Sequence, residues 1–310
     1  MHEEVWKLIE NNHYITLISH INPDGDTLGS ALSFYPSLKQ MGKNVSLVNV
    51  TTEIAGKYDF LPNFKKIKNT LPAKCDLLIS FDCGSFDRLG IERGNFKIIN
   101  IDHHKSNTMY GDINIVDTSY PSCTLIAYDI LELNHSITKD EAVCIYTGLV
   151  IDTGFFVHPN TDALTFNYAE KLISKGVNPA KISENLKMRN SLAKTRLTAV
   201  FINSIALLND ATIAVGTITQ DDFKKTGALK SDSDHLVDIL RNLATVELAI
   251  LVIEEQDATF KISLRSKKHL DVSTIAQSFG GGGHKRAAGF ESTELKTETI
   301  IKKIIEKATS

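Results

Sequence analysis

The chain has 310 residues, of which 42% are hydrophobic and 23% are charged, and its formal net charge at pH 7 is −3. These values are typical of a folded protein long enough for two domains, and they exclude a disordered chain, a collagen-like repeat and a coiled-coil rod. No apolar run approaches the ~20 residues of a membrane span, so we expect no membrane partner. A protein that coats duplex DNA would be more basic, because it must neutralise many phosphates.

The N-terminal segment and the cysteines indicate where the protein works. The first ten residues contain three glutamates and no basic segment followed by an apolar one, which argues against a secretory signal. The four cysteines, Cys75, Cys83, Cys123 and Cys144, form no C-x-x-C pair. We therefore expect a cytoplasmic protein whose cysteines are small, reduced and buried side chains.

The first part of the chain alternates strand-like and helix-like segments. Strands are expected at Tyr14–Ser19, Val45–Val50, Asp76–Phe81 and Lys97–Ile101, with a helix over Thr27–Met41. From Ser122 to Phe201 the periodicity is helical, with helix starts at Thr138 and Asn178. Apolar strands separated by helices are typical of parallel sheets. Residues 1–185 are thus predicted to form an α/β domain with a mainly parallel sheet flanked by helices.

A smaller α/β domain is expected over residues 210–310, after a helical linker at 186–209. The linker is predicted as one connecting helix, Lys187–Leu208. Strands are expected at Ala211–Thr219, Leu248–Ile253 and Thr259–Leu264, and helices at His235–Ala244, Val272–Phe279 and Thr297–Lys307.

Acidic and imidazole side chains collect where the predicted strands end. The first strand leads to His20, Asp24 and Asp26, a later strand leads to Asp82, and another leads to Asp102, His103 and His104. Asp152 follows an apolar stretch and precedes a glycine turn. Because ligands bind at the carboxyl edge of an open α/β sheet, we expect these groups to share one crevice.

So many carboxylates in one crevice need positive charge among them, and divalent cations are the simplest source. Carboxylates with imidazoles and without thiolates suit Mn²⁺, Zn²⁺ or Fe²⁺ and disfavour a structural zinc site. Two cations that share a carboxylate could activate a water for phosphoryl transfer. Taken singly, an Asp-Gly-Asp turn or an aspartate that caps a helix explains each feature. Their coincidence in one domain favours a common site.

A second candidate segment lies near the C-terminus. Four consecutive glycines, Gly280–Gly283, precede His284, Lys285 and Arg286, and Arg265 lies shortly before them. Glycine backbone N–H groups with nearby basic side chains can bind an anion. The alternative is a flexible glycine turn beside a solvated basic segment. The segment is not a Walker loop, since G-x-x-x-x-G-K-[ST] is absent.

These motifs, in this order, resemble those of the DHH phosphoesterases with a DHH-associated C-terminal domain. The similarity covers nearly the whole chain, from His20-x-Asn-Pro-Asp24-Gly-Asp26 to the glycine-rich Gly280–Arg286. The compact length is most similar to the nano-RNase and 3′-phosphoadenosine 5′-phosphate phosphatase branch. RecJ-like exonucleases usually carry further domains.

The resemblance implies a role for each motif residue. It implies that His20, Asp24 and Asp82 bind one metal ion and that Asp26, Asp82, His103 and Asp152 bind a second. Asp102 would orient His103, and His104 would face the scissile phosphate. Substrate would bind through Arg265, the glycines Gly281, Gly282 and Gly283, and the basic side chains His284, Lys285 and Arg286. Arg88 and Ser122 are weaker candidates for substrate contact.

The implied activity is that of a Mn²⁺-dependent phosphodiesterase that degrades short RNA or DNA oligonucleotides to mononucleotides, with Mg²⁺ or Co²⁺ as alternative cations. The resemblance also implies activity on 3′-phosphoadenosine 5′-phosphate, and it is compatible with a homodimer. The sequence leaves open a cyclic-di-AMP or pApA phosphodiesterase, a RecJ-like exonuclease and a non-enzymatic nucleotide-binding regulator. One departure from the family pattern is Phe155 after Asp152-Thr153-Gly154, where relatives often carry arginine or a small residue; stacking would then replace a phosphate contact.

Overall fold

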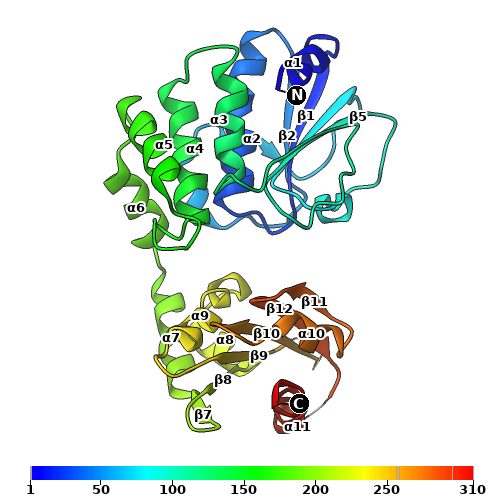
Figure 1. The fold of residues 1–310 in the computed structure, drawn as a ribbon. Helices are drawn as coiled ribbons and strands as arrows, with labels where there is room; N and C mark the ends of the chain where they lie inside the picture. The colour runs from blue at the N-terminus through cyan, green and yellow to red at the C-terminus, as the bar shows by residue number, and fades with distance from the viewer. Residues whose placement is uncertain (1, 256, 258, 295, 310) are drawn as a thin grey trace. The chain divides into compact units, whose positions relative to one another are not determined.

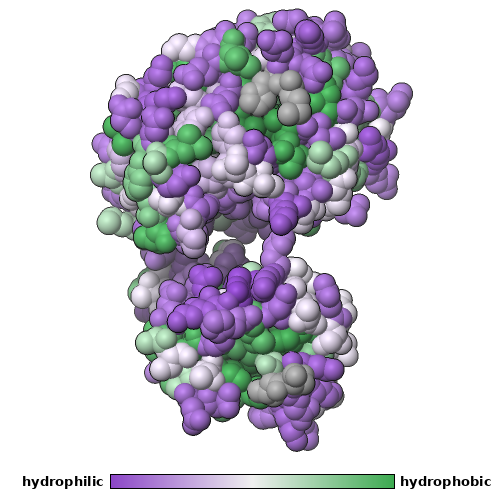
Figure 2. Space-filling view, in the orientation of Figure 1, coloured by the Kyte–Doolittle hydropathy of each residue, from purple (hydrophilic) through white to green (hydrophobic). Residues whose placement is uncertain are grey.

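The computed structural model of the chain describes residues 2–255, 257, 259–294 and 296–309. The chain divides into two compact units, Met1–Arg189 and Asn190–Ser310, each built on its own six-stranded sheet (Figure 1). Hydrophilic side chains cover much of the visible face of both units (Figure 2). Within the described ranges, no helix has the length and apolar character that crossing a membrane requires.

The sheet of the first unit is entirely parallel, which confirms the predicted fold class. Its strands lie in the order β3-β2-β1-β4-β5-β6, with the bounds Tyr14–Ser19 for β1, Asn44–Val48 for β2, Ile67–Lys68 for β3, Leu77–Phe81 for β4, Lys97–Asp102 for β5 and Ile113–Val116 for β6. The strand order reverses between β1 and β4. In a doubly wound sheet, this reversal opens a crevice at the carboxyl ends of the strands.

The helices of the first unit are α1 (His2–Glu10), α2 (Gly25–Gln40), α3 (Cys123–Glu132), α4 (Lys139–Asp152), α5 (Ala163–Ser174) and α6 (Pro179–Lys187). They lie on one side of this sheet, where α2 and α3 contact the strands, α4 packs on α2 and α3, and α5 packs on α4 (Figure 1). A smaller apolar cluster lies on the other face, where Ile18, Leu78 and Ile98 of the strands pack with the loop residue Leu89. Since both faces are buried, the strands are continuous apolar runs rather than alternating ones.

The two helix starts that the sequence predicts in this region are confirmed. The Thr138 side chain accepts the N–H of Glu141, whose carboxylate in turn accepts the N–H of Thr138, so a capping box begins α4. The Asn178 side chain accepts the N–H of Lys181, and Pro179 occupies the first turn of α6.

Glycines allow α2 and α4 to pack at short range. A Cβ at Gly29 would lie 2.4 Å from the carbonyl oxygen of Cys144, and one at Gly148 would lie 2.4 Å from Thr124 Cγ2 and 2.6 Å from Asp26 Oδ1. No side chain fits at either position without a shift. This close packing fixes the end of α4, where Asp152 lies, relative to the start of α2.

The second unit has a mixed sheet in the order β11-β12-β10-β9-β8-β7. Its strands are β7 (Ala206–Leu208), β8 (Ile213–Ile218), β9 (Leu248–Glu254), β10 (Phe260–Ser266), β11 (Gly282–His284) and β12 (Ala287–Ser292), and its helices are α7 (Leu192–Asn203), α8 (Gln220–Thr226), α9 (Leu236–Arg241), α10 (Val272–Gln277) and α11 (Thr297–Thr309). Only β8 and β9 pair in parallel. Residues of α10 and α11 pack on one face of the sheet, and residues of α7 and α9 pack on the other.

The predicted continuous helix Lys187–Leu208 is wrong. Helix α6 ends at Lys187, and a new helix begins after Ser191, whose side chain accepts the N–H of Lys194. The chain leaves α7 at Asn203 because Ala206–Leu208 pairs with β8. Leu197 and Phe201 of α7 are buried in the core of the second unit, so this helix is part of a domain rather than a free connector.

We expect Gly29→Ala to destabilise the first unit by about 1–3 kcal/mol, because its methyl group would collide with a backbone carbonyl that cannot move without separating α2 from α4. Urea unfolding followed by circular dichroism measures this. Gly56→Ala is the matched control, since nothing lies within 4 Å of its added methyl group. Equal stability of the two variants would contradict this account of the helix packing.

Candidate metal centre

Segments far apart in the sequence bring acidic and imidazole side chains to one end of the first sheet. His20 follows β1, Asp82 follows β4, and Asp102, His103 and His104 end or follow β5. Asp24 and Asp26 begin α2, while Asp152 is the last residue of α4. The strand ends are adjacent because β1, β4 and β5 are parallel neighbours, so the crevice expected from the sequence forms here.

The structure gathers six of the predicted residues into two groups whose potential ligand atoms lie within 4.8 Å of one another: His20, Asp24 and Asp82 in one, and Asp26, His103 and Asp152 in the other. A third combination of this kind contains Asp82, His103 and His104. Oxygen and imidazole nitrogen atoms at such spacing are suitable ligands for a divalent cation.

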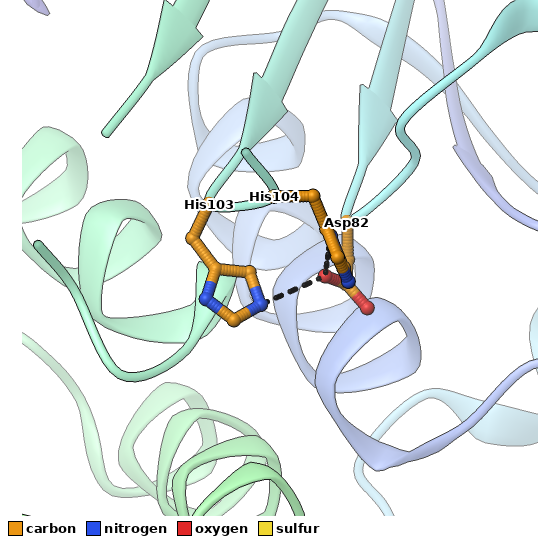
Figure 3. Close-up of side chains that lie close together, drawn as sticks. All are labelled: Asp82, His103 and His104. Carbon is orange, nitrogen blue, oxygen red and sulfur yellow. Dashed lines mark ion pairs between the residues drawn. The ribbon is translucent and has the colours of Figure 1, made fainter. Parts of the chain in front are cut away.

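Asp82 connects the groups through its two carboxylate oxygens. Oδ2 lies 3.7 Å from His20 Nε2, whereas Oδ1 lies 3.4 Å from His103 Nε2 (Figure 3). Asp152 Oδ2 lies 3.1 Å and Asp26 Oδ2 lies 3.8 Å from the same His103 nitrogen. Asp82 has a left-handed backbone, with φ of 54°, which is costly outside glycine and occurs most often at functional sites. One carboxylate therefore faces both groups.

Backbone carbonyls orient the two imidazoles of these groups. His20 Nδ1 lies 2.8 Å from the carbonyl oxygen of Ile21, and His103 Nδ1 lies 3.2 Å from that of Tyr120. A nitrogen that faces a carbonyl oxygen donates its proton there, which leaves Nε2 of each ring as the potential metal ligand. Both Nε2 atoms point toward the carboxylates.

Helix N-termini hold two of the carboxylates. Asp24 caps α2 by accepting the N–H groups of Asp26 and Thr27. Asp26 is fully buried and accepts the N–H groups of Cys123 and Thr124, at 2.7 and 2.9 Å, at the start of α3. The positive end of a helix stabilises such anions, so the first turns of α2 and α3 keep these carboxylates in place.

The cluster shifts the acidity of its own members. Burial and the charge of Asp82 raise the pKa of Asp24, and burial with Asp82 and Asp152 raises the pKa of Asp26 well above its usual value. Burial opposes a charge on His103, but the neighbouring carboxylates of Asp152 and Asp82 raise its pKa to about 12. The carboxylates therefore retain positive charge or protons beside them, which a divalent cation would replace.

Two buried atoms test whether a cation fits. Within the described part of the chain, Asp82 Oδ1 and His103 Nε2 have no hydrogen-bond partner, although both are shielded from solvent. Buried polar atoms are rarely left unsatisfied. A divalent cation between these atoms would satisfy both at once, so the donor set fits a metal.

Asp102 acts on a different histidine from the one predicted. Its Oδ1 lies 2.7 Å from His104 Nδ1, and it also accepts the backbone N–H of His103 at 2.8 Å. The His103 ring is oriented by the Tyr120 carbonyl instead. The sequence could not show this, because a backbone carbonyl leaves no signal in the residue type. Asp102 is fully buried and fixes the ring of His104.

The predicted substrate contacts of the first unit differ in exposure. Arg88 is exposed, and its Nη2 lies 3.5 Å from His20 Nδ1 at the edge of the cluster. Ser122 has no exposed surface, and its hydroxyl lies 2.9 Å from that of Thr124. The Ser122 side chain is thus buried at the start of α3 and faces Thr124 rather than solvent, and its contact with a substrate stays a prediction.

Phe155 lies in a strained turn beside Asp152. Gly154, Phe155 and Phe156 all have left-handed backbones, with φ of 56°, 61° and 64°. The ammonium group of Lys187 lies 3.3 Å from the centre of the Phe155 ring, which is a cation–π contact. Lys187 therefore covers one face of this ring and brings a positive charge near the cluster, a partner that the sequence did not indicate.

The glycine-rich segment of the second unit forms a hairpin rather than an open anion-binding loop. Gly282–His284 is β11, which pairs with Ala287–Gly289 of β12. A Cβ at Gly283 would lie 2.5 Å from both Ala287 O and Ala288 Cα, so glycine is required by the hairpin packing. His284 and Lys285 are exposed, and Arg265 shares a shallow cavity of about 420 Å³ with Gly282 and Gly283. Gly281 lies beside the cavity wall, where its Cβ would meet Gly289 O.

Arg286 and Glu247 hold the neighbouring basic loop from opposite sides. Arg286 donates to the carbonyl oxygens of Lys268 and Leu270. Glu247 accepts the N–H groups of Lys268, His269 and Leu270 at 2.6–3.0 Å. Arg286 thus supports the loop, and the sequence did not single out Glu247 because a lone acidic residue carries no signal.

The fold and this cluster define a metal-binding α/β enzyme. The DHH family N-terminal domain model matches residues 14–149, and the DHHA1 domain model matches residues 210–310. The chain therefore belongs to the DHH phosphoesterases, and it is a hydrolase that acts on phosphoester bonds.

Relatives are similar over nearly the whole chain. The bifunctional oligoribonuclease and PAP phosphatase NrnA of Thermus thermophilus is 28% identical over 98% of this chain and 91% of its own length, and that of Bacillus subtilis is 29% identical over 93% and 92%. The crystal structure of an exopolyphosphatase-related protein from Bacteroides fragilis matches with a TM-score of 0.90 at 25% identity, over 99% of this chain and 94% of that one.

Asp82→Ala removes the carboxylate that lies next to both His20 and His103, the imidazoles of the two groups. We expect Mn²⁺ binding, measured by isothermal titration calorimetry, to weaken at least tenfold, because both groups lose a ligand. Asp76→Ala, at an exposed contact to the N–H groups of His13 and Tyr14, is the control. Binding of Mn²⁺ to Asp82→Ala with unchanged stoichiometry and affinity would contradict the shared role.

Glu247→Gln tests the support of the basic loop. Partial burial opposes a charge on Glu247, but the N–H groups of Leu270, His269 and Lys268 lower its pKa below the usual 4.5. Its stabilisation is therefore present above pH 4.5 and is lost as the pH falls through the folded-state value. We expect the variant to be less stable by about 1–2 kcal/mol at pH 7 in urea unfolding. This difference should shrink below pH 4.5; a difference that persists unchanged there would refute the charge-based account.

Proposed function

We propose that the chain is a Mn²⁺-dependent two-metal phosphodiesterase that degrades short oligonucleotides to mononucleotides from an end, with activity on 3′-phosphoadenosine 5′-phosphate as well. The observation that carries the proposal is Asp82, whose oxygens face His20 in one ligand group and His103 in the other. The names of the relatives from Thermus thermophilus and Bacillus subtilis support the substrate class.

The ligand sets follow the two groups. His20, Asp24 and Asp82 would hold one cation, and Asp26, Asp82, His103 and Asp152 would hold the other. Such a pair of cations supplies a water of lowered pKa and neutralises charge on the attacked phosphate. Mn²⁺ suits mixed oxygen and imidazole ligands, with Mg²⁺ or Co²⁺ as alternatives.

His104 handles the proton of the leaving group in this proposal. Its Nδ1 is bound to Asp102, which leaves Nε2 as the group that would face the substrate. An imidazole oriented in this way can give a proton to the leaving oxygen as the phosphoester bond breaks. Asp102 stabilises the charged ring and sets its direction.

Each unit, taken by itself, offers cationic and hydrogen-bonding groups that would bind parts of a substrate. Arg88, next to His20, would contact the scissile phosphate. Within the second unit, Arg265, His284 and Lys285 with the N–H groups of the glycine hairpin would bind another phosphate or the terminal nucleotide. Residues 1–185 would thus form the catalytic domain and residues 210–310 the substrate-binding domain, with 186–209 between them. The cytoplasmic location and the homodimer stay predictions.

One time course distinguishes this function from its alternatives. Purified protein with Mn²⁺ receives an RNA dinucleotide, a ~24-residue single strand, 3′-phosphoadenosine 5′-phosphate and cyclic di-AMP in parallel. We expect the dinucleotide to be hydrolysed at least tenfold faster than the long strand, because the relatives whose names support the substrate class are oligoribonucleases.

Faster attack on the long strand would favour a RecJ-like exonuclease instead, and cyclic di-AMP as the best substrate would favour a signal-degrading enzyme. Hydrolysis of no substrate by the wild type would refute the proposed function. His104→Gln is the matched variant, which should retain Mn²⁺ binding while its kcat falls at least a hundredfold.

A further inference from the structure

A chain of side-chain amides lies behind Asp102. Asn107 Nδ2 donates to Asp102 Oδ2 at 2.5 Å, and Asn107 Oδ1 accepts from Asn100 Nδ2 at 3.0 Å. Asn100 Nδ2 also lies 3.4 Å from Asn114 Oδ1. Asn100 is fully buried on β5, two residues before Asp102. The amides thus form one connected line that ends at the carboxylate.

Backbone groups fix the direction of the Asn107 and Asn114 amides in this line, and the Asn100 NH₂ group then faces the oxygens of both. Asn114 Nδ2 donates to the carbonyl oxygen of Gly111 at 2.8 Å, and Asn114 Oδ1 accepts the Gly111 N–H at 3.0 Å. The N–H of Met109 donates to Asn107 Oδ1 at 2.7 Å. Because these groups can only donate or only accept, they fix which end of each amide is oxygen. Asn107 must therefore present its NH₂ group to Asp102.

The result at Asp102 is a carboxylate with donors on both oxygens. Oδ2 is taken by Asn107, while Oδ1 accepts from the N–H groups of His103 and His104 and from His104 Nδ1. A carboxylate held at both oxygens cannot rotate toward another partner. The His104 ring then has one favoured tautomer, with the proton on Nδ1 and the lone pair on Nε2.

We propose that Asn107 is a positioning residue for His104 that acts through Asp102, with Asn100 and Asn114 holding the Asn107 amide in its working direction. This inference rests on the proposed function, since it assigns a partner to the histidine given the proton-transfer role there. Asn107 does not reach the substrate. It keeps the Asp102 carboxylate aligned so that Nε2 of His104 stays directed away from it.

A neighbouring, partly buried polar pair supplies a control. Tyr110 Oη and Ser80 Oγ lie 2.8 Å apart under the same strands, and Ser80 Oγ also lies 3.5 Å from Asn100 Oδ1. Within the described residues, neither hydroxyl is a hydrogen-bond partner of Asp102. Tyr110→Phe removes the Tyr110–Ser80 hydrogen bond and changes none of the groups that connect Asn114, Asn100, Asn107 and Asp102. It therefore reports what a merely structural loss does to the enzyme.

The test compares Asn107→Ala and the isosteric Asn107→Asp with Tyr110→Phe and the wild type. We expect kcat for the dinucleotide with Mn²⁺ to fall 10–100-fold in both Asn107 variants, the range typical for partners behind an active-site histidine. KM and the Mn²⁺ affinity from calorimetry should stay within threefold, and Tyr110→Phe should keep kcat within twofold. If Asn107→Ala does not fold, Asn107→Asp, which keeps the volume, carries the comparison.

The tautomer of His104 gives a readout that does not depend on catalysis. Two-bond ¹H–¹⁵N correlation spectra with diamagnetic Mg²⁺, assigned by comparison with His104→Gln, should show the Nδ1–H form in the wild type and in Tyr110→Phe, and a mixture of forms in the Asn107 variants. An unchanged tautomer, or equal losses of kcat in Asn107→Ala and Tyr110→Phe, would overturn the inference. If the wild type hydrolyses no substrate, the proposed function fails, and the spectra alone decide this inference.

Discussion

The electrostatics of Asp82 and its neighbours determine how the first unit is built. Asp82 is buried among Asp24, Asp26 and Asp152, and burial together with mutual repulsion raises the pKa of Asp24 and Asp26. Such a cluster exists in a folded protein only if positive charge lies among the carboxylates. His20 and His103 supply part of it, with hydrogen bonds that bring the pKa of Asp82 below its usual range despite its burial. The negative charge that the two imidazoles do not compensate is suited to binding divalent cations.

Helix dipoles compensate another part of the negative charge of the carboxylates. Two N–H groups at the N-terminus of α2 donate to Asp24, and two at the N-terminus of α3 donate to Asp26. Two helices therefore stabilise the anionic side chains. Asp152 lies at the C-terminal end of α4, where the helix dipole does not stabilise a carboxylate. The close packing of α4 against α2 depends on the contacts at Gly29 and Gly148. The packing of α4 against α2 therefore determines where Asp152 lies in the candidate metal centre.

The sequence predicts well which side chains the fold brings together, because of a general property of parallel sheets. His20, Asp82 and His103 each follow an apolar strand, and strands β1, β4 and β5 end at one edge whatever their order. What could not be predicted depends on backbone geometry. The partner of Asp102 is decided by a carbonyl at Tyr120, and the need for Gly283 by the closeness of β12. Neither leaves a trace in the choice of side chain at the position concerned.

Contacts between side chains and the backbone also matter for how a chain with net charge −3 can bind phosphate groups. Arg286 and Lys267 donate to backbone carbonyls and so support a loop, so these two basic side chains are already engaged within the second unit. Affinity for phosphate would then be concentrated at the cations and at a few side chains such as Arg88 and Arg265. If affinity is concentrated in this way, a long strand would gain little from its additional phosphates. A short substrate would lose nothing, which agrees with the proposed preference for short oligonucleotides.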